Sequence, residues 1–345
     1  MKEFTKFSHI DQFRQVYKEI LSRAQFIGKD EEGKAIYDNT IIPKPIKFYG
    51  TVKLHGTNSS ICECNRERWF QKRSNFVTID HDNAGFAYFA TQKKEAFDKL
   101  FNVIYQEFGL KENYIYCIYG EWFGQGIQKS VAISQLSKRF AIFDVVMCNG
   151  EKKFHLPPNF IKTLFDPEND IYNVFLFKTY EIEINFERPE TAVEELNKLT
   201  LEVEEHCPAG QYFEVDGIGE GIVWNHRTED GLNVYRFKTK GEKHSNTKVK
   251  KINQVVGITP EEIESINEFV DYALTQNRLE QGLKEIFGDE EPSHSGIGNF
   301  VKWCVSDVMR EEADTIAKNN LKPKFVVNAL NSKARNFILE ELKKF

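Results

Sequence analysis

The sequence predicts an α+β fold in which antiparallel sheets with flanking helices are followed by an all-α C-terminal domain. As far as residue 240, short segments of strand-like hydrophobic pattern follow one another with few helices between them, which is typical of antiparallel sheets. Beyond residue 258, hydrophobic residues recur only at helical spacing. A lysine-rich stretch separates the two patterns, so we expect domains at residues 1–240 and 259–345, joined by a linker at residues 241–258.

The composition supports two folded domains. With 345 residues the chain exceeds a minimal domain, and its 41% hydrophobic residues, among them 29 Phe and 13 Tyr, can fill a sizeable core. The net charge of −6 excludes a protein that is basic throughout, although a local basic patch can still bind phosphate groups.

The sequence predicts neither a signal peptide nor a membrane span, because the first residues are polar and no run of about 18 apolar residues occurs. We therefore expect a monomer in the cytoplasm, either that of its own cell or, for a phage or viral protein, that of the host. Six cysteines in a chain of this length predict no disulfide framework. Cys62 and Cys64, on one face of a strand, are expected to be reduced thiols.

The first expected element is a helix. Ser8 and Asp11 resemble a capping box, hydrophobic residues follow at helical spacing as far as Ala24, and Gly28 ends the pattern. A second amphipathic helix is expected at residues 92–108, with a glycine at its end.

Strands account for most of the remaining first domain. They are expected at residues 46–54, 59–64, 69–72, 114–122, 139–147, 172–177, 221–224 and 233–239. In the second domain, Thr259, Pro260 and Glu262 form a helix start in which the threonine caps the first turn. Further helices are expected at residues 278–287, 298–313 and 323–344.

Residues 51–58, TVKLHGTN, place Lys53 at the end of an extended segment and Gly56 at a turn. A lysine amine is a nucleophile only when it is unprotonated, and burial beside other cations lowers its pKa from the usual value of about 10.4. Lys238 and Lys240, later in the chain, are candidates for these cations.

Five further motifs follow in order. They contain Arg73 (QKRS), Glu121 (YGEWFG), Phe143 (AIFDV), Glu220 (GEGIVW) and the pair Lys238 and Lys240 (RFKTKG). With the lysine motif, this ordered set resembles the covalent nucleotidyltransferase superfamily of DNA ligases, RNA ligases and mRNA capping enzymes. The form Lys-x-His-Gly-Thr-Asn is similar to the RNA ligase 2 family of phage nick-sealing and kinetoplastid RNA-editing ligases. That family has a helical C-terminal region where the other enzymes have an OB fold.

The resemblance implies an ATP-dependent RNA ligase with Mg²⁺ or Mn²⁺ as its metal. Lys53 would attack the α-phosphorus of ATP and hold AMP as a phosphoramidate. The AMP would pass to an RNA 5′-phosphate, which would then be joined to a 3′-hydroxyl, as in RNA repair. His55 would serve the steps after adenylation, while Asn58 and Arg73 would lie near the phosphate and the RNA ends. Arginine suits that role because its fork contacts phosphate through two hydrogen bonds.

The resemblance also implies a nucleotide pocket. Glu121 would contact the ribose, Phe143 would stack on adenine, and Glu220 would bind the divalent metal, with Glu121 as the second candidate ligand. Lys238 and Lys240 would grip the α-phosphate, where cations stabilise the charge of the transition state.

The residue before the nucleophile departs from the family pattern. Relatives often carry Glu at this position, where it helps to read the base, but here the residue is Val52. The choice of ATP over GTP would then rest on backbone groups and on the shape of the pocket.

Two other interpretations stay open. The first is a DNA ligase or a capping-type nucleotidyltransferase, against which the Lys-x-His-Gly-Thr-Asn form and the helical tail argue. The second is a non-catalytic RNA end-binding module, which has no chemical need for the complete set of charged motif residues. The RNA substrate is open between a nicked duplex, a single-stranded end and a broken tRNA. Lysines at residues 243–251 are either a solvated linker or contacts to the RNA backbone.

Overall fold

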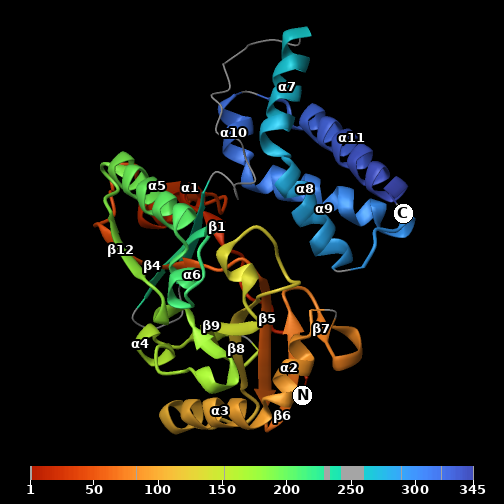
Figure 1. The fold of residues 1–345 in the computed structure, drawn as a ribbon. Helices are drawn as coiled ribbons and strands as arrows, with labels where there is room; N and C mark the ends of the chain where they lie inside the picture. The colour runs from red at the N-terminus through yellow and green to blue at the C-terminus, as the bar shows by residue number, and fades with distance from the viewer. Residues whose placement is uncertain are drawn as a thin grey trace. The chain divides into compact units, whose positions relative to one another are not determined.

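The computed structural model describes residues 2–82, 84–150, 152–228, 234–241, 260–288, 290–319 and 321–344. The chain divides into two compact units, Met1–Gly241 and Glu242–Phe345, and each has a hydrophobic core of its own. Antiparallel sheets with helices in the first unit and helices in the second confirm the predicted α+β class (Figure 1). The expected linker, apart from Gly241, and the Thr259 cap lie outside the described residues.

Two large sheets form the first unit. The first sheet has the strand order β1 (Asp11–Gln12), β14 (Val234–Lys240), β13 (Gly221–Arg227), β4 (Ile46–Lys53) and β12 (Thr179–Ile184). The second sheet has the order β10 (Lys153–His155), β9 (Arg139–Cys148), β8 (Ile115–Phe123), β5 (Thr57–Cys64), β6 (Glu67–Lys72) and β7 (Phe76–Val77), with β11 (Ile171–Asn173) beside β9. Neighbouring strands run antiparallel, except that β1 is parallel to β14 and β11 to β9. A separate hairpin pairs β2 (Phe26–Lys29) with β3 (Ala35–Tyr37).

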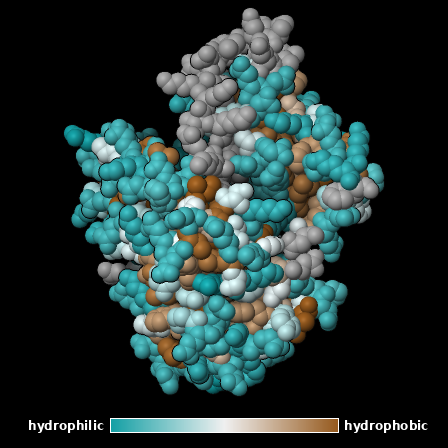
Figure 2. Space-filling view, viewed as in Figure 1, coloured by the Kyte–Doolittle hydropathy of each residue, from teal (hydrophilic) through white to brown (hydrophobic). Residues whose placement is uncertain are grey.

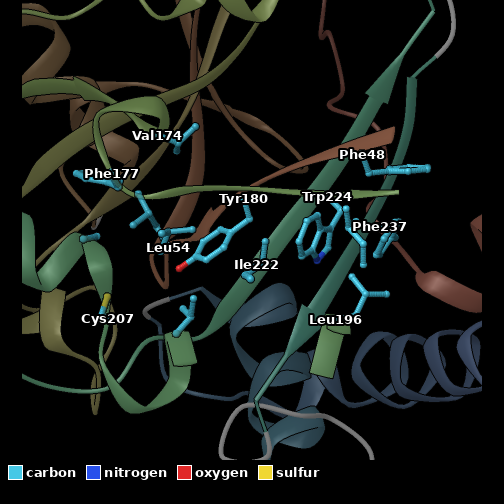
Figure 3. Packing of buried hydrophobic residues seen from close by; sticks show 14 of the residues in the cluster. Phe48, Leu54, Val174, Phe177, Tyr180, Leu196, Cys207, Ile222, Trp224 and Phe237 are labelled. Carbon is cyan, nitrogen blue, oxygen red and sulfur yellow. The ribbon is translucent and has the colours of Figure 1, made fainter. Parts of the chain in front are cut away.

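Helices cover one face of each sheet. They are α1 (Phe13–Gln25), α2 (Phe86–Gln92), α3 (Lys94–Phe108), α4 (Pro158–Ile161), α5 (Pro189–Glu205) and α6 (Pro208–Tyr212). Leu196 of α5 packs in one cluster with Ile222, Trp224 and Phe237 of the first sheet (Figure 3). Val16 of α1 belongs to the same cluster. In the same way, α2 and α3 contribute to a second cluster on the second sheet. The opposite face of each sheet, which these helices do not cover, can carry the polar residues of a site.

The chain before α1 is extended, so the prediction of a helix that starts near Ser8 was wrong. The helix begins at Phe13, and Gln12 forms its capping box with Gln15. Thr5 exchanges hydrogen bonds with the buried side chain of Gln71, which is distant in sequence. These long-range bonds satisfy the backbone in an extended conformation, which a local capping pattern does not reveal.

Several expected strands and helices are present with shifted ends, and others were not expected. The strand expected at residues 172–177 is the shorter β11, whereas β12, α2 and α5 had no counterpart in the expected elements. Strict alternation in β12, TYEIEI, buries every second residue, which is the ordinary pattern of a half-buried strand.

The cysteine expectation needs correction. Cys62 of β5 and Cys117 of β8 lie directly opposite each other and form a disulfide, so Cys62 is not a reduced thiol. Cys64 is free and lies in the same buried cluster as Cys62, which confirms that the two share one face of the strand. Composition could not reveal the bond, because it depends on the register between strands 55 residues apart.

In the part of the second unit that the structure describes, all regular secondary structure is helical. Its helices are α7 (Pro260–Ala273), α8 (Gln276–Phe287), α9 (Ile297–Glu311), α10 (Ala313–Lys318) and α11 (Pro323–Glu341). Phe269, Phe300 and Leu330 lie in its core. Hydrophilic side chains predominate on the molecular face shown in Figure 2. In the described part of the chain, no helix is both long enough and apolar enough to cross a membrane.

Candidate active site

The register of the first sheet brings two of the expected lysines together. Strand β13 lies between β4 and β14, and Gly221 is paired with Lys53 on one side and with Lys240 on the other. Gly221 has φ +148°, and a Cβ at this position would collide with the carbonyl oxygen of Thr239. Glycine is therefore required where the two lysine-bearing strands approach the same point.

Glu220, the residue before this glycine, binds both lysines through its buried carboxylate. Its Oε2 accepts a hydrogen bond from Lys53 Nζ at 2.7 Å and lies 3.1 Å from His55 Nδ1. Its Oε1 lies 2.9 Å from Lys240 Nζ. We call Glu220, Lys53, His55 and Lys240 the Glu220 centre.

The charge of Glu220 is fixed by its partners. Burial alone would raise the pKa of this carboxyl, but the charges of Lys240 and Lys53 and the contact with His55 hold the pKa well below its usual value of 4.5. Glu220 is only 3% exposed, so its charge is screened little by solvent. The Glu220 centre thus contains a permanent anion among cations.

Lys238 adds a further positive charge. It lies two residues before Lys240 on β14 and therefore projects to the same face of the sheet. Burial lowers the pKa of Lys240, Glu220 opposes this shift, and the charges of Lys53 and Lys238 reinforce it. The three expected lysines thus act on one another electrostatically, as binding of a polyanion requires.

The second sheet supplies another carboxylate. Glu121 of β8 lies opposite Asn58 of β5, and its Oε1 accepts a hydrogen bond from the Gly56 backbone N–H at 3.0 Å. A Cβ at Gly56 would collide with the Trp122 carbonyl oxygen, which explains the glycine in the lysine motif. Burial raises the pKa of Glu121 to about 7; the charge of Lys53 opposes the rise and that of Glu220 adds to it.

Ion pairs also join the two sheets. Asp144 of β9 binds Arg227 of β13 at 2.9 Å and Arg236 of β14 at 2.7 Å, and it lies 2.8 Å from His155 Nδ1. Burial would raise the pKa of Asp144, but Arg227, His155 and Arg236 lower it below its usual value. Asp144 was not among the expected site residues, although it directly follows Phe143 in the same motif.

Phe143 lies where the register between β8 and β9 shifts, and it is half-buried. Its ring centroid is 5.0 Å from that of Phe7, in the extended N-terminal chain. No local pattern in the sequence marked Phe7 as a neighbour of the site.

Arg73 and Val52 differ in how they reach the site. Arg73 follows β6 and is exposed, and its positive charge lowers the pKa of Glu121, so it acts on the site electrostatically. Val52 is 2% exposed and packs in the core beside Ile222, on the face opposite Lys53. Its side chain therefore does not lie on the face of the sheet that carries Lys53.

The donor chemistry fits Mg²⁺ or Mn²⁺ bound together with phosphate. Within the described ranges, no group of three or more His, Cys, Asp or Glu could hold a metal on its own. Glu121 and Glu220 interact electrostatically, so their charges lie in one site. Magnesium is bound in such sites through one or two carboxylates, with substrate phosphates and water completing its shell.

Solved structures of the Naegleria gruberi RNA ligase resemble the chain. A lysine-to-alanine variant with ATP and Mn is 15% identical, with a TM-score of 0.45 and coverage of 70% of this chain and 58% of that one. A lysine-to-methionine variant with AMP and Mn is 15% identical, with a TM-score of 0.44 and coverage of 69% of this chain and 56% of that one. The ligase with PPi is 16% identical, with a TM-score of 0.43 and coverage of 70% of this chain and 56% of that one. This chain therefore spans less than two thirds of the length of those proteins. No protein of curated function matches it.

The model of the RNA ligase family matches residues 46–240. This range is more than half of the chain; it begins with β4, which carries Lys53, and ends at Lys240, the last residue of β14. Every motif residue discussed above lies inside it. The chain belongs to the RNA ligase family.

Proposed function

We propose that the protein is an ATP-dependent RNA ligase that forms a covalent AMP adduct on Lys53. It transfers the AMP to an RNA 5′-phosphate and joins this end to a 3′-hydroxyl. The observation that carries the proposal is the Glu220 centre, in which a buried carboxylate contacts two lysines from separate strands. Such an arrangement holds a nucleophilic amine beside a second cation, as phosphoryl chemistry requires.

The first step joins AMP to the protein. Lys53 Nζ loses a proton to solvent and attacks the α-phosphorus of ATP, so a P–N bond forms. The bond from this phosphorus to its bridging oxygen breaks, and pyrophosphate leaves with the electron pair. Lys240 and Lys238 stabilise the negative charge that gathers on the phosphoryl oxygens.

Other residues bind the nucleotide. Phe143 offers a partly exposed ring for stacking on adenine, Glu121 accepts a hydrogen bond from the ribose, and Asn58, opposite Glu121, faces the phosphates. The backbone at Val52 is the group nearest Lys53 that can read the base. A divalent cation held by Glu220 and Glu121 would neutralise phosphate charge.

Two further transfers complete the reaction. An oxygen of the RNA 5′-phosphate attacks the adenylate phosphorus, and the P–N bond breaks to return Lys53 as the amine. The RNA 3′-hydroxyl then attacks the activated 5′-phosphate, loses its proton and releases AMP. His55 and Arg73 act in these RNA steps, and a nicked duplex is one candidate substrate. We propose that the protein acts as a monomer in the cytoplasm, and that the helical unit engages RNA.

Labelled nucleotide tests the proposal directly. The wild-type protein should form an acid-resistant adduct with labelled ATP, whereas Lys53→Ala and Lys53→Arg should form none, because a guanidinium is never deprotonated in proteins. The matched control is Lys47→Ala, since Lys47 lies on the same strand but pairs with Glu181 at the surface and should leave labelling unchanged. Labelling of Lys53→Ala would remove Lys53 from the mechanism. Labelling by GTP instead would favour a capping-type enzyme, and a folded wild type without any adduct would favour the binding module.

A further inference from the structure

The extended chain before α1 contacts the site although it lies outside the region that the RNA ligase family model matches. We call residues 5–12 the N-terminal segment. Its first residue is fixed to the second sheet: the Thr5 N–H donates to Gln71 Oε1 at 2.9 Å, and Gln71 Nε2 and Tyr119 Oη donate to the Thr5 carbonyl at 3.1 and 2.5 Å. Both partner side chains are buried, so this end of the segment is rigid.

Phe7, in the middle of the N-terminal segment, contacts residues of both sheets. Its buried ring lies 4.9 Å from the Tyr119 ring and 5.0 Å from the Phe143 ring, and the Arg236 guanidinium lies 4.6 Å from its centroid. Aromatic and cation–π contacts of this kind add stabilisation beyond the buried area.

The last residues of the N-terminal segment join the first sheet. Strand β1 pairs with β14 in parallel, with Asp11 opposite Phe237 and Gln12 opposite Lys238. The segment is therefore held at its beginning, middle and end, and His9 lies between two of these anchors.

His9 contacts Arg73. Its Nδ1 lies 3.1 Å from Arg73 Nη2. Because a guanidinium only donates hydrogen bonds, Nδ1 must be the acceptor, which places the imidazole proton on Nε2. Nε2 lies 3.8 Å from Asp11 Oδ1, within ion-pair range but longer than a hydrogen bond, so the negative charge of Asp11 favours a proton on Nε2. The result is an ordered row from Asp11 through His9 to Arg73.

We propose that His9 is a positioning residue that aims the Arg73 guanidinium at the phosphate of an RNA end. This inference rests on the proposed function, which assigns Arg73 to the RNA phosphate. Arg73 is exposed, and holding an arginine side chain in one geometry costs rotamer entropy. An acceptor fixed by the rest of the fold reduces this freedom before RNA binds, so less entropy is lost when the phosphate contact forms.

The test compares His9→Ala, Arg73→Ala and the double variant in two single-turnover assays, labelling by ATP and sealing of RNA that already carries a 5′-adenylate. We expect His9→Ala to slow the same step as Arg73→Ala, by about tenfold, the loss typical of one charge-assisted hydrogen bond. The double variant should be no slower than Arg73→Ala alone. His9→Asn, whose amide oxygen takes the place of Nδ1, should recover most of the rate. The control is Ser8→Ala, an exposed neighbour, which should behave as wild type.

A second measurement does not depend on activity. Nitrogen NMR of the full-length protein should show His9 Nδ1 as an unprotonated acceptor, with a resonance that changes in Arg73→Ala. The inference would be overturned if the rate losses of the two single variants multiply in the double variant. It would also be overturned if His9→Ala or Arg73→Ala reacts at the wild-type rate, or if His9 Nδ1 is protonated. Absence of any AMP adduct in wild type would instead overturn the proposed function, while the NMR result would still decide the contact between His9 and Arg73.

Discussion

Glu121 and Glu220 are carboxylates of one site whose pKa values shift in opposite directions. Glu220 contacts Lys53, Lys240 and His55, which keep it ionised although it is buried. Glu121 accepts one backbone hydrogen bond, and burial raises its pKa to about 7. Divergent pKa values in neighbouring carboxylates mark different tasks. Glu220 can hold cations at any physiological pH, whereas Glu121 changes its charge near neutrality.

Replacement of Glu121 tests its raised pKa. The folded protein keeps a proton on Glu121 that the unfolded chain releases above pH 4.5, so this carboxyl lowers the free energy of unfolding as the pH rises from 4.5 through about 7. Glu121→Gln keeps the acceptor oxygen but does not titrate. By urea denaturation, its stability relative to wild type should be clearly greater at pH 8 than at pH 5.

The control for this prediction is Glu181→Gln, because Glu181 is exposed and pairs with Lys47 at the surface. Its stability relative to wild type should change little between the two pH values. An equal effect of Glu121→Gln at both pH values would show that the pKa of Glu121 is not raised.

Removal of either charge partner at the Glu220 centre should strongly slow adenylation. Glu220→Ala leaves Lys53 and Lys240 without their shared anion, and Lys240→Ala removes a cation from the phosphate. Each should slow adduct formation by about 100-fold or more, as loss of one transition-state charge partner costs a few kcal/mol. Rapid-quench labelling measures the rate, and EDTA should abolish it in wild type. Labelling that persists in EDTA would contradict the metal role proposed for Glu220.

At the scale of elements, β13 is the central strand of the site. It places Gly221 between Lys53 and Lys240 and directly follows Glu220, so its backbone sets the distance between the two lysine-bearing strands. The alternation that puts Lys53 towards the site puts Val52 and Ile222 into the core. The packing of the core and the geometry of the site therefore both depend on the same arrangement of strands.

Gly221→Ala tests this dependence. The new Cβ would meet the carbonyl oxygen of Thr239, and φ +148° is itself strained for alanine. Gly33→Ala is the matched control, because Gly33 has φ +81° but no atom lies within 4 Å of a Cβ there. Thermal unfolding should show Gly221→Ala at least about 2 kcal/mol less stable than Gly33→Ala, and only Gly221→Ala should lose adduct formation. Equal stability of the two variants would mean that the Gly221 contact relaxes freely.

The strands that carry the motifs could be predicted from sequence, and the N-terminal segment could not. Strands such as β4 and β5 show their hydrophobic patterns locally, within the residues that form them. Ser8 and Asp11 also form a local pattern, but hydrogen bonds from Gln71 and Tyr119 decide the conformation there. Local patterns contain no information about partners so distant in the chain.

The same limit applies to the site. The order of motifs predicted a site that contains Lys53, Glu220 and Lys240, and in the structure both lysines contact Glu220. It could not predict that Gly221 pairs with both lysines, because this depends on the order of strands in the sheet. It also gave no sign of His9, which carries no motif and reaches Arg73 only in the folded chain.

At the scale of the whole molecule, the chain consists of two units with separate hydrophobic cores. All motif residues belong to the first unit, which ends at Gly241. The second unit has its own buried ion pairs, in which Arg278 binds Asp307 at 3.0 Å and Glu311 at 2.8 Å. As far as the structure describes them, the hydrophobic clusters of the first unit consist of its own residues, so we expect this unit to fold alone.

A chain that ends at Gly241 tests this separation. It should still form the AMP adduct, because every nucleotide-contacting motif is present, but it should lose most end joining if the helical unit engages RNA. Lysine contacts to phosphate release counterions, so RNA affinity of the full-length protein should fall more steeply with salt than that of the truncated one. A circular dichroism melt controls for folding. Equal sealing by both chains, or a folded truncated protein that does not react with ATP, would contradict the separation.

The order of strands in the first sheet also governs when a newly made chain acquires its site. Strand β4 pairs with β12 and β13, which are made after it. Strand β1, close to the N-terminus, can pair only after the synthesis of β14, which ends at Lys240. At ribosomal rates, roughly ten to forty seconds separate the synthesis of Lys53 from that of Lys240. For most of this interval Lys53, the proposed nucleophile, is already made but lacks Glu220, Lys238 and Lys240. If Lys53 is the nucleophile, as proposed, a nascent chain cannot form the AMP adduct before its first unit is complete.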